Sequence, residues 1–195
     1  WGEIERNKEK YGYDIPFTIL VDPTTACNKK CIGCWAADYN KALNLSFEQL
    51  DKLFTEGKEL GIYFYIMTGG EPLVRKKDIL RLAEKHDDCV FMIFTNGTLI
   101  DQQFCDDLCR LGNIVPTISV EGFGDATDGR RGKGSWKDIM RAMDLMKLNK
   151  VPFGFSTCFT TANCDSVLSN KFIDLMIDKG AFFSWYFTFM PVGCG

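Results

Sequence analysis

Hydrophobic residues occur along this chain in two alternating patterns, which are short continuous apolar runs and longer stretches with helical spacing. The short runs predict strands, because a strand that is covered on both faces is apolar along its whole length. A polar or glycine-containing segment follows almost every run. The strands are expected at residues 17–21, 62–67, 90–95, 114–120, 153–159 and 183–189.

Helices are predicted between the strands, since Leu, Ile, Phe, Ala or Met residues return there every three or four positions. Ser46 and Gln49 form a capping-box pattern at the start of the first helix, and Gly61 marks its end. The later helices are expected near 77–86 and from starts at Asp101, Ser135 and Asp165.

This alternation predicts an α/β fold, a partial (β/α)6 TIM-like barrel with parallel strands and right-handed crossovers. Six strands are too few to close the usual eight-stranded barrel, and no helix signal follows the last strand, so we expect a barrel truncated after the sixth strand. Residues 15–195 are expected to form this core domain, with residues 1–14 as an exposed lead-in. The polar segments are expected to meet at the C-terminal edge, where parallel barrels carry their chemistry.

Three cysteines, Cys27, Cys31 and Cys34, lie within eight residues after the first predicted strand. Thiolates are the normal ligands of iron–sulfur clusters, so three of them suit a four-iron cube in which one iron has no protein ligand. A structural zinc site needs a fourth Cys or His, and the single histidine, His86, lies outside the loop. A disulfide pair with one spare thiol is the other alternative.

The cysteine loop, followed after the second strand by Gly69-Gly70-Glu71-Pro72, resembles the radical S-adenosylmethionine (radical SAM) enzymes. The resemblance runs from the first strand to the sixth, and is to core domains found in SPASM-type and molybdenum-cofactor-biosynthesis-like members. It implies that Cys27, Cys31 and Cys34 hold three irons of a [4Fe-4S] cluster, whose fourth iron binds the methionine moiety of S-adenosylmethionine. It also implies reductive cleavage to a 5′-deoxyadenosyl radical, which abstracts hydrogen from a substrate.

The resemblance implies contacts to S-adenosylmethionine for further residues. Gly69, Gly70, Glu71 and Pro72 would receive the methionine ammonium, and Glu71 would either hold the local turn or offer a carboxylate. The remaining candidates are Ser119 and Glu121 for the carboxylate or ribose, Arg131 for the methionine carboxylate, and Met190 for the adenine.

The residue before the third cysteine departs from the family pattern, because it is Gly33 where many members have an aromatic residue. Adenine stacking at that position is therefore not expected, and Trp35 could replace it. Six cysteines lie outside the loop, and they are interpreted as structural except for Cys194, which follows the last strand where relatives with a SPASM-type extension bind auxiliary clusters. The other five are Cys89, Cys105, Cys109, Cys158 and Cys164.

The composition of the chain limits the classes of molecule that it is expected to bind. A net charge of −3 gives no electrostatic reason to bind nucleic acid, and no apolar run has the length of a membrane span. Nine cysteines without a regular pairing pattern indicate a reducing, cytoplasmic compartment. The resemblance implies a flavodoxin- or ferredoxin-like one-electron reductant as a partner and leaves the substrate open, with a peptide among the candidates. An electron-transfer or iron–sulfur binding module without radical catalysis, and a zinc-stabilised fold, remain alternatives.

Overall fold

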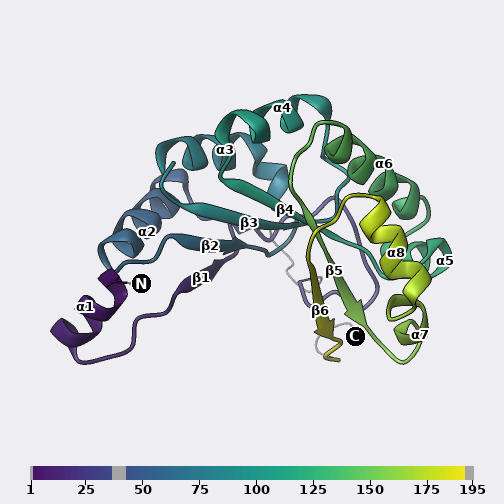
Figure 1. Cartoon of the computed structure of the whole chain (residues 1–195), viewed down its shortest axis with the longest axis horizontal. Coiled ribbons are helices and arrows are strands. Elements are labelled where there is room, and N and C mark those ends of the chain that lie inside the picture. The colour runs from purple at the N-terminus through teal and green to yellow at the C-terminus, as the bar shows by residue number, and fades with distance from the viewer. Residues whose placement is uncertain (1, 37–42, 192–195) are drawn as a thin grey trace.

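Six parallel strands form one sheet in the computed structural model, which describes residues 2–36 and 43–191. The strands follow one another in chain order across the sheet, and every neighbouring pair is parallel. Figure 1 shows the sheet curled into a half-barrel. The predicted fold class is therefore confirmed. The strands are β1 (Thr18–Val21), β2 (Phe64–Met67), β3 (Val90–Thr95), β4 (Ile114–Ser119), β5 (Gly154–Phe159) and β6 (Ser184–Thr188).

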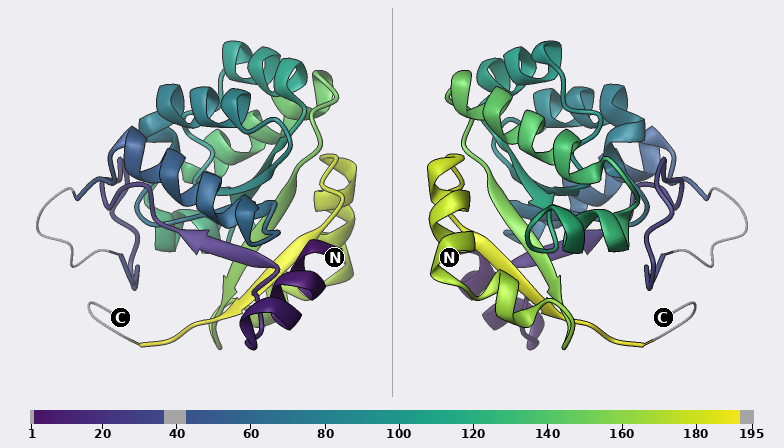
Figure 2. Two further views of the ribbon diagram at one scale, coloured as in Figure 1. Left: turned by 90° about the vertical axis from the view of Figure 1, so that its left-hand side faces the viewer. Right: turned by 90° about the vertical axis from the view of Figure 1, so that its right-hand side faces the viewer.

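Helices cover the convex side of the sheet and leave its concave side open, as the side views show (Figure 2). The capping box at Ser46 is present, with Gln49 N donating to Ser46 Oγ and Ser46 N donating to Gln49 Oε1. The helices are α1 (Gly2–Tyr11), α2 (Phe47–Glu59), the 3-10 turn η1 (Pro72–Arg75), α3 (Lys76–Lys85), α4 (Gln102–Leu111), α5 (Gly124–Arg131), α6 (Ser135–Leu148), α7 (Cys164–Val167) and α8 (Asn170–Asp178).

The helix after β5 differs from the prediction. Asp165 does not cap a long helix, since it lies inside the short helix α7. The longer helix, α8, begins after Ser169, whose hydroxyl accepts a hydrogen bond from Phe172 N. Asp and Ser are both good N-caps, and the fully buried Val167 fixes where the chain turns between the two helices.

Residues 2–11 form a helix, which the sequence pattern did not predict, and none of its residues is buried. Glu3 and Glu5 lie in its first turn and Lys8 and Lys10 in its last turn, so its charges complement the helix dipole. Helix α5 was also not predicted. None of the helices in the described residues is long and apolar enough to cross a membrane.

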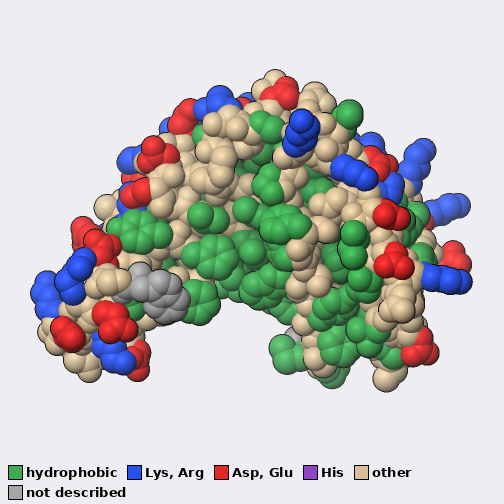
Figure 3. All heavy atoms as spheres, in the orientation of Figure 1, with side chains coloured by type: hydrophobic (Ala, Val, Ile, Leu, Met, Phe, Trp, Pro, Cys, Tyr) green, Lys and Arg blue, Asp and Glu red, His purple; other side chains and the backbone are tan. Residues whose placement is uncertain are grey.

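Alternate residues of the strands pack against the helices and form the core. Phe91, on β3, and Tyr65, on β2, are fully buried there against Phe54 of α2. The other strand residues, which alternate with these, face the concave side of the sheet. There, Phe94 of β3 contacts Trp185 and Phe187 of β6, each at a ring-centroid distance of 5.6 Å. Figure 3 shows hydrophobic side chains gathered along this concave side.

Candidate functional site

The glycine-rich segment after β2 lies directly against the start of the cysteine loop after β1. Gly70 N donates to Thr24 O at 2.9 Å, and Glu71 N donates to Ala26 O at 2.8 Å. These backbone hydrogen bonds extend the pairing of β1 with β2 beyond the strand ends. The two sequence motifs are therefore neighbours at the C-terminal edge of the sheet, as the pattern of parallel strands predicted.

Only glycine fits at two positions of this segment. A Cβ on Gly70 would lie 2.2 Å from Ala26 O, and one on Gly69 would lie 2.5 Å from Thr24 O. Gly69 also has a φ of +99°, which residues with side chains rarely adopt. The backbone of the glycine-rich segment therefore lies directly against the backbone at the start of the cysteine loop, with no side chain between the two segments.

The three thiols of the loop lie near enough to influence one another's charge. Partial desolvation raises the pKa of Cys27 and of Cys31, and the neighbouring thiols of the loop raise both further. The guanidinium of Arg131 acts in the opposite direction on Cys31, because a positive charge favours the thiolate. All eight described cysteines are free, and Cys194 lies outside the described residues.

Glu71 holds the turn and does not point outward. Its carboxylate is buried and accepts hydrogen bonds from Leu73 N (3.0 Å), Thr95 Oγ1 (2.7 Å) and Asn96 N (2.7 Å). Burial raises the pKa of Glu71, and the three hydrogen bonds act against this rise. The side chain thereby joins the exit of β2 to the exit of β3, while Pro72 starts the 3-10 turn η1.

Asn28 connects the cysteine loop to the end of β3. Its Oδ1 accepts a hydrogen bond from Asn96 Nδ2, and its Nδ2 donates to Thr98 Oγ1, both at 2.8 Å. Lys29, the next residue, donates through Nζ to Ser135 Oγ at the start of α6. The loop is thus fixed to two further elements of the barrel by side chains that lie between its first two cysteines.

Glu121, after β4, is the centre of a second buried network. Its Oε1 accepts hydrogen bonds from Arg130 Nη1 (2.5 Å) and from Arg131 Nε (2.8 Å), and its Oε2 accepts one from Cys158 N (3.0 Å). Arg130 also donates to Ile32 O and accepts from Ile32 N, so it fastens the cysteine loop to α5. The charge of Glu121 raises the pKa of Arg131, which stays a cation.

The other two predicted site residues lie differently. Ser119 contacts Ser156 across β4 and β5, with 3.2 Å between their hydroxyl oxygens. Met190 follows β6, and the residue is 71% exposed. Among the described residues, neither belongs to the networks of Glu71 and Glu121. Their contacts to S-adenosylmethionine stay predictions, as do those of Gly69, Gly70, Glu71, Pro72, Glu121 and Arg131.

Sequence reasoning missed three residues that organise the loop. Asn28 was not singled out, and Arg130 was set aside in favour of Arg131, which is followed directly by a glycine. Arg75 Nη1 donates to Pro23 O at 2.8 Å and also to Leu45 O, so it closes the two ends of the segment that contains the cysteines. An arginine that binds carbonyl oxygens leaves no pattern in the sequence, because any residue can supply a carbonyl group.

The residues present fit an iron–sulfur cluster with S-adenosylmethionine. Three free thiols supply the donors that such clusters require, and Gly69 and Gly70 let the glycine-rich segment pack directly against the backbone of the cysteine loop, where a Cβ would clash with Thr24 O or Ala26 O. A half-barrel of parallel strands, with this loop at its C-terminal edge, defines an α/β protein whose chemistry lies at the strand ends. The sequence model of the Radical SAM superfamily matches residues 21–167, and the chain belongs to this superfamily.

Two relatives of this chain have names that give different enzymatic activities. The chain is 30% identical to the GTP 3',8-cyclase of Campylobacter lari over 179 residues, which are 86% of this chain and 53% of the relative. It is 32% identical to the Fe-coproporphyrin III synthase of Methanosarcina barkeri over 69% of this chain and 35% of that protein. The chain thus spans about half or less of the length of these proteins.

A solved structure shares the fold across nearly the whole chain. The structure of Streptococcus suis SuiB bound to S-adenosylmethionine superposes with a TM-score of 0.79. It covers 98% of this chain and 45% of SuiB, at 17% sequence identity. At this level of identity the likeness shows the half-barrel fold alone.

Proposed function

We propose that this chain is the core of a radical SAM enzyme that holds a [4Fe-4S] cluster through Cys27, Cys31 and Cys34. When bound, this cluster supplies the electron that cleaves S-adenosylmethionine to methionine and a 5′-deoxyadenosyl radical, which takes hydrogen from the substrate. The observation that supports the proposal most directly is the close backbone packing of Gly70 against Ala26, which holds the glycine-rich segment against the start of the cysteine loop.

The remaining residues of the site hold the glycine-rich turn in place and add positive charge beside the cysteine loop. Glu71 is fully engaged by Leu73, Thr95 and Asn96, so its part is to hold the glycine-rich turn in place. Arg131 lies near Cys31 and is held by Glu121, which leaves a buried positive charge beside the cluster loop. That charge favours the thiolate form of Cys31 and suits the carboxylate of the methionine moiety.

A single variant tests the proposal. After anaerobic reconstitution, the wild-type chain is expected to bind about four irons and four sulfides, and with a reductant to form 5′-deoxyadenosine from S-adenosylmethionine. Cys31→Ala should lose the cleavage, whereas Cys109→Ala, which removes an exposed cysteine on α4, should keep it. Cleavage that survives Cys31→Ala contradicts the proposal.

An electron-transfer module is the second candidate, supported by the same three thiols. It requires no affinity for S-adenosylmethionine, so calorimetry on the reconstituted chain separates the two. Heat of binding that disappears in Cys31→Ala supports the enzyme, and no heat of binding with a fully loaded cluster supports the electron-transfer module.

We also propose a class of reductant and a class of substrate for this enzyme. A flavodoxin- or ferredoxin-like protein is the class of partner that supplies single electrons at low potential. For the substrate we propose a peptide, since the structure of SuiB has also been solved with its precursor peptide SuiA. The open concave side of the half-barrel, lined by Phe94, Trp185 and Phe187, offers the apolar surface that peptide side chains would contact.

A further inference from the structure

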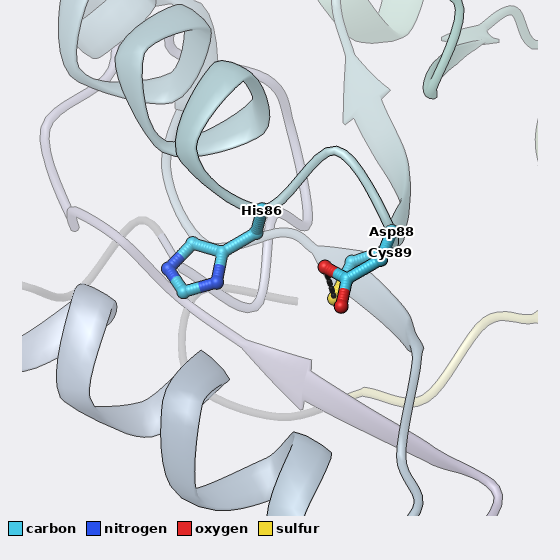
Figure 4. Close-up of side chains that lie close together, drawn as sticks. All are labelled: His86, Asp88 and Cys89. Atoms are coloured by element: carbon cyan, nitrogen blue, oxygen red, sulfur yellow. Dashed lines mark hydrogen bonds between the residues drawn. The ribbon is translucent and has the colours of Figure 1, made fainter.

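A second group of metal-ligating side chains lies at the opposite edge of the sheet from the cysteine loop. His86 ends α3, and Asp88 and Cys89 come just before β3 begins at Val90. One ligand atom from each of the three residues lies within 4.8 Å of the other two. Figure 4 shows the Asp88 carboxylate next to the Cys89 thiol, and the His86 ring apart from them with one ring nitrogen on their side.

His86 carries a buried nitrogen that has no hydrogen-bond partner. The residue is 2% exposed, and its Nε2 lies 2.9 Å from Asp51 Oδ1 on α2. Within the described part of the chain, Nδ1 has no partner. An unsatisfied polar atom in the interior is costly and therefore rare. With Nε2 donating to Asp51, the lone pair of Nδ1 is free and lies on the side of Cys89 and Asp88.

The other two groups complete a mixed donor set. Cys89 is fully buried, and its thiol donates to Asp88 Oδ1 across 3.7 Å. The carboxylate of Asp88 is half exposed and also accepts hydrogen bonds from Lys58 Nζ at 3.0 and 3.2 Å. The group is thus closed on the side of His86 and Cys89 and open to solvent at Asp88, which gives an ion a path of entry.

We propose that His86 Nδ1, Cys89 Sγ and a carboxylate oxygen of Asp88 bind one Zn²⁺ ion, with water as the fourth ligand. Imidazole, thiolate and carboxylate are the ligands that zinc takes in proteins, in a four-coordinate arrangement. Asp51 supplies the carboxylate that commonly orients a zinc-binding histidine through its other ring nitrogen. As the zinc–sulfur bond forms, the thiol proton of Cys89 leaves to solvent.

This zinc site keeps one position for water, unlike the closed four-ligand sites that are purely structural, and it takes no part in the chemistry of the cysteine loop. It joins the end of α3 to the start of β3 and, through Asp51, to α2. The N-terminal edge of a parallel barrel carries stability, whereas the C-terminal edge carries the reaction. The site assigns Cys89 a ligand role, where the sequence alone indicated a structural cysteine.

Zinc binding is best measured in the whole 195-residue chain with Cys27→Ser, Cys31→Ser and Cys34→Ser, because these substitutions remove the competing thiols of the loop. Titration with Zn²⁺ is expected to give about one ion per chain and to raise the melting temperature. Cys89→Ser and Asp88→Asn should each abolish both effects. Cys105→Ser, which alters another fully buried cysteine, should change neither effect.

Two further variants distinguish a metal site from a structural cluster. Asp51→Asn should weaken zinc binding by about 10-fold to 100-fold, since it disturbs the orientation of His86. Lys58→Met should strengthen binding, because it removes a positive charge that competes for Asp88.

The proposal is overturned if the chain with the loop substitutions binds no zinc. It is equally overturned if Asp88→Asn, a change at an exposed side chain that leaves the fold intact, binds zinc as well as its parent. Since the three thiols of the cysteine loop are absent from this experiment, neither result bears on the proposed radical chemistry.

Discussion

Arg131 donates two hydrogen bonds to a single oxygen of Glu121, from Nε at 2.8 Å and from Nη2 at 2.5 Å. Arg130 binds the same oxygen, so two guanidinium groups share one buried carboxylate. A charge pair in the interior depends on both partners, because removing one leaves the other desolvated and unpaired.

Glu121→Gln is therefore expected to destabilise the chain strongly. It removes the negative charge and leaves Arg130 and Arg131 without compensation, so the free energy of unfolding should fall by about 3 kcal/mol. Urea denaturation measures this change. Glu84→Gln is the matched control, since Glu84 pairs with Arg110 at the exposed surface, and it should change stability by less than about 1 kcal/mol. Equal losses in the two variants would show that Glu121 is not a buried counter-charge.

Gly70→Ala should prevent cluster assembly. The added methyl group meets Ala26 O at 2.2 Å, so the glycine-rich segment and the cysteine loop must separate. Iron content after anaerobic reconstitution measures the effect and should fall well below that of the wild-type chain. Gly129→Ala is the control, because nothing lies within 4 Å of its added Cβ and it lies in helix α5. This control should retain iron and gain about 0.5 kcal/mol of stability. Full iron loading of Gly70→Ala would contradict the close contact.

Asn28→Ala should loosen the cysteine loop without removing a ligand. The substitution deletes the hydrogen bonds to Asn96 and Thr98, each of which contributes about 1 kcal/mol. We expect the reconstituted cluster to bleach several-fold faster in air, as followed by its visible absorbance. Asn7→Ala removes a hydrogen bond to Glu59 O far from the loop, and its cluster should bleach at the wild-type rate. Identical rates in both variants would mean that Asn28 does not hold the loop.

Asp128→Ala should remove a pH-dependent contribution to stability at the start of α6. Asp128 accepts hydrogen bonds from Trp136 N and Gly134 N, which lower its pKa below the ordinary value of 3.8. Because the folded-state pKa lies below the unfolded one, its stabilisation is complete above the unfolded pKa and is lost as the pH falls through the folded pKa. At neutral pH the variant should lose about 1 kcal/mol.

Unfolding measured at neutral and acidic pH checks this expectation. The difference between wild type and Asp128→Ala should shrink below about pH 4. The exposed Asp174 in α8 supplies the control, since Asp174→Ala should change stability by less than about 0.5 kcal/mol at either pH. A difference that is constant with pH would show that the carboxylate charge of Asp128 is not involved.

The sequence was most informative where a pattern is local or is repeated along a strand. The apolar runs predicted all six strands, and Ser46 with Gln49 predicted the capping box. The rule that parallel strands end at one edge predicted that Cys27 and Gly70 lie close together. Each of these predictions follows from backbone geometry that neighbouring residues determine.

What the sequence did not predict depends on contacts between distant residues. Ser169, and not Asp165, caps the longer helix, because the burial of Val167 decides between two residues of similar capping ability. The inward direction of Glu71 depends on Thr95 and Asn96, which lie on another strand exit. Such choices are made by the packed structure and leave no periodic signal.

The last strand of the half-barrel has one further consequence. Within the described residues, β6 lies at the edge of the sheet and pairs only with β5. Its sequence, Ser-Trp-Tyr-Phe-Thr, contains no charge and no proline, and so lacks two of the features that protect an exposed edge from strand addition. At high concentration this chain should therefore self-associate through β6, and Phe187→Lys should reduce that self-association in light scattering.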